Sequence, residues 1–147
     1  MKLDAIRRYR AQVEDVLRMD LLQARQNLQE VENLCLALEA QTQESSAQYS
    51  SKVSAGMALE EFVEWQTTFD AEAALLTQAR QTEGRLRGVW TQKQQDLREA
   101  MQERRTLDRL AERVRLQEQA ARDRVEQMQM DEAARRTGAT GGLRNSL

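Results

Sequence analysis

Apolar residues recur every three or four positions along most of this 147-residue chain, which is the spacing of one face of an α-helix. The first run of this pattern extends from Leu3 to Leu38 and predicts a helix over about residues 2–50. Its phase shifts at Leu21, and such a stutter locally unwinds a left-handed supercoil. The predicted seam, the row of side chains that faces a partner helix, comprises Leu3, Ile6, Arg10, Val13, Leu17, Leu21, Ala24, Leu28, Val31, Cys35 and Leu38.

A second run of the same spacing predicts a longer helix over about residues 58–136. Its seam weakens near Gly84 and Gly88, where charged residues replace apolar ones, and it resumes in a new phase at Leu107. Trp65 falls off this seam, so we expect its ring at the edge. The predicted seam comprises Leu59, Phe62, Gln66, Phe69, Ala73, Leu76, Arg80, Glu83, Arg87, Trp90, Leu97 and Met101, then Leu107, Leu110, Val114, Ala121, Val125 and Met128.

Serine and glycine gather between the two runs, and we predict a turn over about residues 51–57. Ser54 is expected to cap the start of the second helix, because a serine hydroxyl accepts a hydrogen bond from an unpaired amide of the first helical turn. Glycines also follow Thr137. Residues 137–147 are therefore predicted to be a disordered tail.

The chain contains no proline, so nothing fixes φ or removes a backbone donor along these helices. Its 31% of charged and 4% of aromatic residues are typical of coiled coils. The predicted fold is all-α: residues 1–136 form one antiparallel two-helix coiled-coil hairpin with a longer second helix. After about Leu107 that helix would pass the N-terminus and form an overhang. An isolated helix is marginal in water, so we expect a partner to hold the overhang.

Composition argues against several kinds of function. A net charge of −2 is unlike that of a nucleic-acid binder, which needs surplus positive charge. With no histidine and the single Cys35, we expect no catalysis, no metal and no cofactor. Cys35 is in step with Val31 and Leu38 and is expected to be a buried small hydrophobe. No bilayer-spanning stretch or signal-peptide core occurs, so we expect a cytoplasmic protein.

Three local strings carry a resemblance to a known family. They are Arg8-Tyr9-Arg10 leading into residues 18–24 (RMDLLQA), residues 105–113 (RTLDRLAER) and residues 126–136 (EQMQMDEAARR). Together with the two-helix plan they resemble the FliJ family, the stalk of the flagellar type III export ATPase. Departures are Asp20, where such proteins tend to have glutamate, and Gly84 and Gly88 in the second helix. A virulence-type secretion stalk of the YscO kind has the same plan.

The resemblance implies a non-enzymatic stalk, cytoplasmic and peripheral at the inner face of the cell membrane. Its terminal end would enter the hexameric export ATPase, and a second contact would couple the ATPase to the membrane export gate. Contacts with export chaperones are a further implication. The alternatives are a general coiled-coil scaffold or a chaperone for export substrates.

We assign one set of candidate residues to each end of the hairpin. The ATPase end combines apolar side chains with a basic N-terminus, suited to an acidic ring interior. Its residues are Ile6, Tyr9, Arg10, Val13, Leu107, Leu110, Val114, Val125 and Met128. The gate end lies in residues 51–79, which carry one basic and five acidic groups. Its residues are Tyr49, Glu60, Glu61, Glu64 and Trp65, with Trp65 as the anchor.

Overall fold

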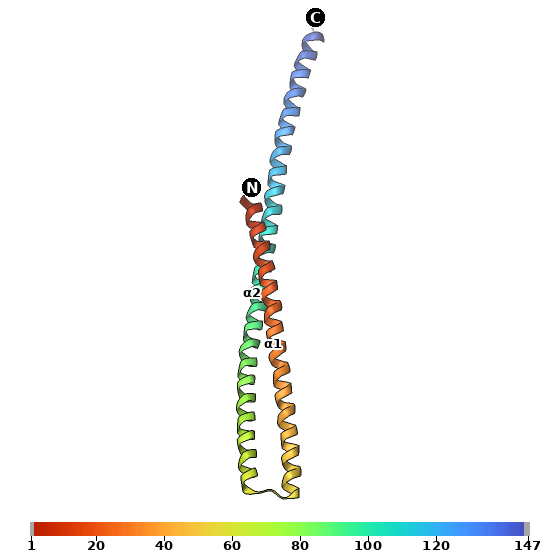
Figure 1. The fold of residues 1–147 in the computed structure, drawn as a ribbon. Coiled ribbons are helices and arrows are strands. Elements are labelled where there is room, and N and C mark those ends of the chain that lie inside the picture. Colours follow the sequence, from red (N-terminus) through yellow and green to blue (C-terminus); the bar gives the residue numbers. More distant parts are fainter. Residues whose placement is uncertain (1, 146–147) are drawn as a thin grey trace. The chain divides into compact units, whose positions relative to one another are not determined.

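The computed structural model describes residues 2–145, and the side chains of residues 2–139. Two helices account for almost all of this range: α1 spans Lys2–Ala55 and α2 spans Leu59–Asn145 (Figure 1). They pack against each other with opposite directions, which confirms the predicted all-α hairpin with a longer second helix. The connection is shorter than the predicted turn over residues 51–57, because α1 continues to Ala55.

The predicted disordered tail is helical as far as Asn145, and residues 146–147 lie outside the described residues. Glycine lowers helix propensity by about 1 kcal/mol relative to alanine, but unlike proline it keeps its backbone donor. Thr137 donates its hydroxyl to the carbonyl of Ala133 at 2.9 Å, within the helix. Gly84 and Gly88 likewise leave α2 unbroken. The glycines therefore weaken the helix without ending it.

Gly56 makes the turn between the helices. Its φ of 102° lies in the region that favours glycine, and its amide donates to the carbonyl of Val53 at 3.2 Å. Ala58 starts α2, because its carbonyl accepts the amide of Phe62 at 3.1 Å. The prediction that Ser54 caps α2 is wrong. Ser54 lies within α1, where its hydroxyl donates to the carbonyl of Ser50 at 3.1 Å.

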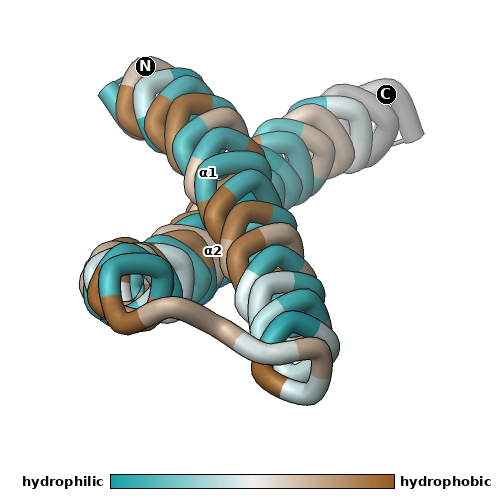
Figure 2. Tube along the Cα trace, turned by 60° about the horizontal axis from the view of Figure 1, so that its bottom comes forward, coloured by the Kyte–Doolittle hydropathy of each residue, from teal (hydrophilic) through white to brown (hydrophobic). Residues whose placement is uncertain are grey.

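The chain forms two compact units, which we describe separately. The larger unit comprises Ala11–Met101, where the two helices lie side by side. Its fully buried apolar residues are few and mostly small: Ala24, Leu28, Cys35, Ala79 and Ala100. Apolar and polar stretches alternate along both helices (Figure 2). Each helix therefore buries only a narrow strip, as expected for two helices without a third layer.

The seam of α1 in this unit follows an unbroken alternation of four and three residues, so the predicted stutter at Leu21 is wrong. Glu14, only 1% exposed, occupies a seam position next to Val13, which is half-buried. An acidic residue at this position hides the repeat from a search for apolar residues. The row comprises Glu14, Leu17, Leu21, Ala24, Leu28, Val31, Cys35, Leu38, Thr42, Ser45 and Tyr49.

The seam of α2 also keeps one register, and it differs from the predicted one. Phe62, Gln66, Ala73, Arg80 and Arg87 are exposed, although the apolar spacing placed them in the seam. The seam comprises Trp65, Phe69, Glu72, Leu76, Ala79, Glu83, Leu86, Trp90, Lys93, Leu97 and Ala100, and it continues in the smaller unit at Arg104, Leu107, Ala111 and Val114. No new phase begins at Leu107.

Two acidic side chains inside the larger unit have hydrogen-bonding partners. Arg18 donates to Glu14 Oε1 at 2.5 Å, one helical turn away. Ser45 donates its hydroxyl to Glu72 Oε1 at 2.6 Å across the two helices. These bonds offset part of the cost of removing a carboxylate from water.

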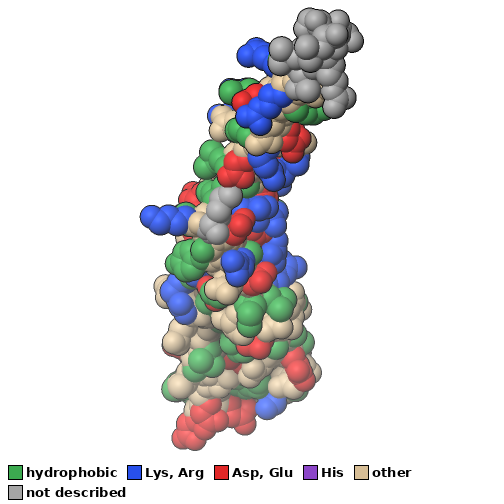
Figure 3. Space-filling view, turned by 90° about the horizontal axis from the view of Figure 1, so that it is seen from above, with side chains coloured by type: hydrophobic (Ala, Val, Ile, Leu, Met, Phe, Trp, Pro, Cys, Tyr) green, Lys and Arg blue, Asp and Glu red, His purple; other side chains and the backbone are tan. Residues whose placement is uncertain are grey.

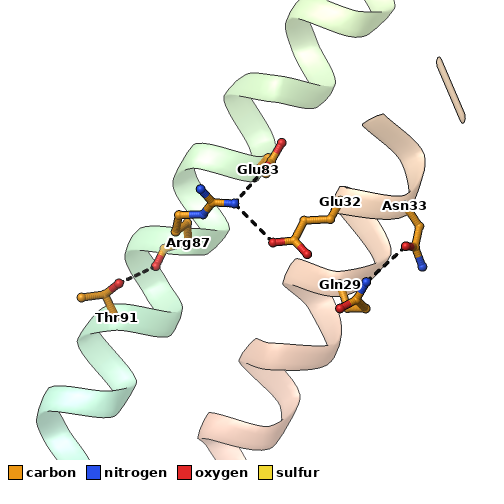
Figure 4. Close-up of polar contacts among 6 residues, drawn as sticks. All are labelled: Gln29, Glu32, Asn33, Glu83, Arg87 and Thr91. Atoms are coloured by element: carbon orange, nitrogen blue, oxygen red, sulfur yellow. Dashed lines mark hydrogen bonds and ion pairs between the residues drawn. The ribbon is translucent and has the colours of Figure 1, made fainter. Parts of the chain in front are cut away.

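Ion pairs at the edges of the seam join the two helices of the larger unit. Arg87 bridges Glu83 on its own helix at 2.8 Å and Glu32 on α1 at 3.3 Å (Figure 4). Arg80 contacts Glu39 at 3.1 Å. Pairs as exposed as these each contribute about 0.2–1 kcal/mol, so they align the helices more than they stabilise them.

The smaller unit comprises the chain up to Arg10 together with the chain from Gln102 onward. Arg7 contacts Asp108 at 3.1 Å, and Arg10 donates to Glu103. These two contacts hold the first turns of α1 along α2. Beyond Val114, every residue of α2 whose side chain is described is exposed, from residue 115 to residue 139. This segment, residues 115–139, is the overhang.

Replacing Gly56 by alanine tests the turn. We expect the free energy of unfolding to fall by about 1–2 kcal/mol, because an L-residue is disfavoured at positive φ. The matched control is Gly84→Ala, which sits in a helix with open space for a Cβ and should gain up to about 1 kcal/mol. Urea unfolding followed by circular dichroism measures both. A Gly56→Ala variant as stable as the parent would contradict the turn geometry.

Candidate interaction surfaces

The aromatic side chains at the turn end of the larger unit pack on one another. Tyr49 of α1 lies between rings of α2, with centroid distances of 5.3 Å to Phe69, 6.0 Å to Trp65 and 6.5 Å to Phe62. The Lys52 ammonium lies over the Trp65 ring at 5.2 Å. Such contacts contribute about 0.5–1.5 kcal/mol per aromatic pair beyond burial. This cluster closes the end of the seam.

Trp65 therefore differs from its predicted place. It is half-buried at a seam position, and Phe62 is the more exposed ring at 45%. The predicted seam passed through Phe62 because Phe62, Phe69 and Leu76 share a spacing of seven, but the helix packs through Trp65 and Glu72 instead. The premise that Trp65 is an exposed anchor is wrong. Tyr49, the other aromatic residue assigned to the gate end, is also half-buried.

The acids assigned to the gate end are exposed. Glu60, Glu61 and Glu64 lie in the first two turns of α2, interleaved with Leu59 and Val63, which are exposed as well. The first two acids also sit where the helix dipole favours negative charge. The resulting surface is acidic with apolar side chains between the charges, and it could contact a basic protein surface.

The ATPase-end residues divide into exposed and half-buried groups. Ile6, Tyr9 and Leu110 are exposed, as are Val125 and Met128 on the overhang. The half-buried ones are Arg10, Val13, Leu107 and Val114. A partner could reach the exposed group without any rearrangement of the helices.

The basic N-terminus is less available than the sequence indicated. Arg7 pairs with Asp108 and Asp4, and Arg10 pairs with Glu103. Lysine and arginine side chains are interspersed with acidic ones along this end of the molecule (Figure 3). Apolar contact rather than net charge is therefore the main chemistry that the overhang offers.

Sequence reasoning did not identify one further apolar surface, on α1 of the larger unit. Val16, Met19 and Leu22 are all exposed there, at intervals of three residues. Leu22 lies beside Trp90, whose ring is covered by the Arg25 guanidinium at 5.1 Å. The signal was present in the sequence: three large apolar residues within two turns that do not share the seam register.

The candidates for chemistry behave as structural residues. Cys35 is buried as predicted, and burial raises the pKa of its thiol. A hydrogen bond to Glu83 and the charge of that carboxylate raise this pKa further. The thiol is therefore protonated at neutral pH, and a thiol is a far weaker nucleophile than a thiolate. Among the residues that the structure describes, no cluster of three potential metal ligands occurs.

The described helices contain no segment with the length and apolar character that crossing a bilayer requires. A family model described as "Flagellar FliJ protein" matches residues 1–142. No curated protein and no solved structure matches the chain.

Trp65→Ala tests whether this residue is a packing residue. Because the ring is half-buried between Tyr49 and Phe69, we expect the free energy of unfolding to fall by roughly 2 kcal/mol. Phe62→Ala is the matched control and should cost less, since that ring is nearly half exposed. Urea unfolding monitored by circular dichroism gives both values. Equal stability of the Trp65→Ala variant and the parent would restore Trp65 as a free surface anchor.

Proposed function

Because the chain belongs to the FliJ family, which implies a role in flagellar export, we propose that it is a non-enzymatic stalk of the export apparatus. In this proposal the terminal end binds the hexameric export ATPase, and the turn end contacts the membrane export gate. The protein would then work peripherally at the inner face of the cell membrane. The flagellar description of the family favours this assignment over a virulence-type stalk.

The observation that carries the ATPase contact is the overhang. A helix that is exposed on all sides from residue 115 to residue 139 is marginally stable by itself, so a partner that surrounds it would stabilise it. Leu116, Val125 and Met128 give this helix apolar side chains that are 52%, 53% and 70% exposed. A ring that encloses the helix would bury them.

The remaining residues assigned to the ATPase end form a second part of the proposed contact. Ile6, Tyr9 and Leu110 would be covered directly, because they are exposed in the smaller unit. The half-buried residues would serve mainly to hold the helices, and these are Arg10, Val13, Leu107 and Val114.

For the gate contact we propose the acidic surface of Glu60, Glu61 and Glu64. These side chains are exposed and lie in the first turns of α2. Tyr49 and Trp65 would support this surface from beneath through their packing. Export chaperones are further candidate partners, and a general coiled-coil scaffold or substrate chaperone is the competing function. Stimulation of the ATPase distinguishes a stalk from both.

Met128→Glu tests the ATPase contact. We expect binding to the export ATPase to weaken about tenfold, because a charge would replace an apolar side chain on the enclosed face. Met130→Glu is the matched control, since Met130 is 67% exposed but lies on another face two residues further along α2. ATPase rate measured against the concentration of the chain gives the affinity. Equal effects of the two substitutions would argue against a specific face.

Removal of residues 115–147 extends the same test. We expect this truncation to abolish stimulation of the ATPase while leaving the midpoint of urea unfolding of the remaining hairpin nearly unchanged. Normal stimulation by the truncated protein would remove the overhang from the proposal.

Replacing Glu60, Glu61 and Glu64 together by glutamine tests the gate contact. We expect the affinity for the gate protein to fall about three- to tenfold and to lose part of its salt dependence, because surface charges act mainly through long-range attraction. Glu30→Gln, an exposed acid elsewhere on α1, is the control. Isothermal titration at two salt concentrations measures the effect. An unchanged affinity and salt dependence would exclude this surface.

A further inference from the structure

The seam of α2 continues beyond the residues that α1 covers. Its last buried or half-buried members, from Ala100 to Val114, alternate by four and three residues. The same alternation runs on into the overhang, where each position is exposed. The continued positions are Glu118, Ala121, Val125, Met128, Glu132 and Arg135. The overhang thus extends an existing helix–helix interface without a partner helix.

We propose that residues 118–135 of α2 pair antiparallel with the same residues of a second copy of this chain. With Val125 facing Met128 of the second copy at the centre, Ala121 faces Glu132 and Glu118 faces Arg135. Facing positions in an antiparallel coiled coil combine the two kinds of seam position, and this register satisfies that rule. Two-fold symmetry repeats each contact.

The charges of this segment select the register. Glu118 and Arg135 attract each other, and Arg124 lies beside the seam where it can reach Asp131 of the second copy. These opposite charges occur at matching distances on either side of the Val125–Met128 centre. The self-complementary charge pattern is the reason to choose a second copy as the occupant.

Other arrangements of two copies lose these contacts. A shift by one heptad places Arg135 opposite Val125, or Glu118 opposite Met128, so that a charge meets an apolar side chain. A parallel pair places Glu118 on Glu118 and Arg135 on Arg135, which brings like charges together. Both alternatives are less favourable than the antiparallel register.

We expect a weak dimer. The paired segment is about 27 Å long, and only the two central layers are fully apolar. A dissociation constant on the order of 100 µM is therefore expected. The pairing uses the face assigned above to the ATPase, but its test contains no ATPase, so the two proposals can fail separately.

Charge reversal with rescue tests the proposal by analytical ultracentrifugation of the full chain, between about 10 µM and 1 mM. Glu118→Arg and Arg135→Glu should each weaken self-association at least tenfold. An equimolar mixture of the two variants should associate as a heterodimer, and the double variant Glu118→Arg/Arg135→Glu should dimerise like the parent. Within one helix these residues lie about 25 Å apart, so rescue cannot arise within a chain.

Glu126→Arg is the matched control, because it changes the net charge equally but lies off the seam; it should leave self-association unchanged. A parent protein that stays monomeric up to about 1 mM would overturn the proposal. Self-association that survives both single reversals, or that the mixture and the double variant fail to restore, would overturn it as well. Helix content by circular dichroism confirms that each variant is folded.

Discussion

The structure depends on the narrow seam that two helices can share. A pair of helices has no third layer to cover it, so each helix buries one strip and leaves the rest to solvent. In this chain the strip contains few fully buried apolar residues, and four of the five are alanine or cysteine. Small side chains fill little space and contribute little apolar burial each. Length therefore compensates for width, and stability is spread over many weak layers.

A seam of this kind tolerates polar residues that a globular core would exclude. Glu14 and Glu72 are buried, yet each reaches a donor: Arg18 one turn along the same helix, and Ser45 across the interface. Polar residues at seam positions of coiled coils cost stability and select one register over its neighbours. The Ser45–Glu72 bond joins the two helices, so sliding one helix past the other would break it and leave a carboxylate buried without a donor.

The same polar residues explain which features could be predicted from the sequence. The helices, their order and the turn follow from the period of the apolar residues, the absence of proline and the serine–glycine cluster. The seam of α2 did not follow, because its true register passes through Glu72, Ala79 and Glu83, while an apolar but exposed alternative passes through Phe62. Where charged and small residues occupy the interface, apolar periodicity is a weak guide to it. For the candidate surfaces, the sequence identified the acids and the overhang, and it failed for Trp65 because that assignment used the wrong register.

The unbroken register of α2 also constrains any partner of the overhang. Positions that pack against α1 as far as Val114 continue on the same face at Val125 and Met128, so a partner helix entering there would extend an interface that is already formed. A helix that must first order itself costs free energy on binding, and the formed part of the seam lowers this cost by holding the start of the overhang. If a second copy and an ATPase ring both use this face, they exclude each other. A weak dimer would then give way to the ring by mass action, and it would cover apolar side chains while no ring is present.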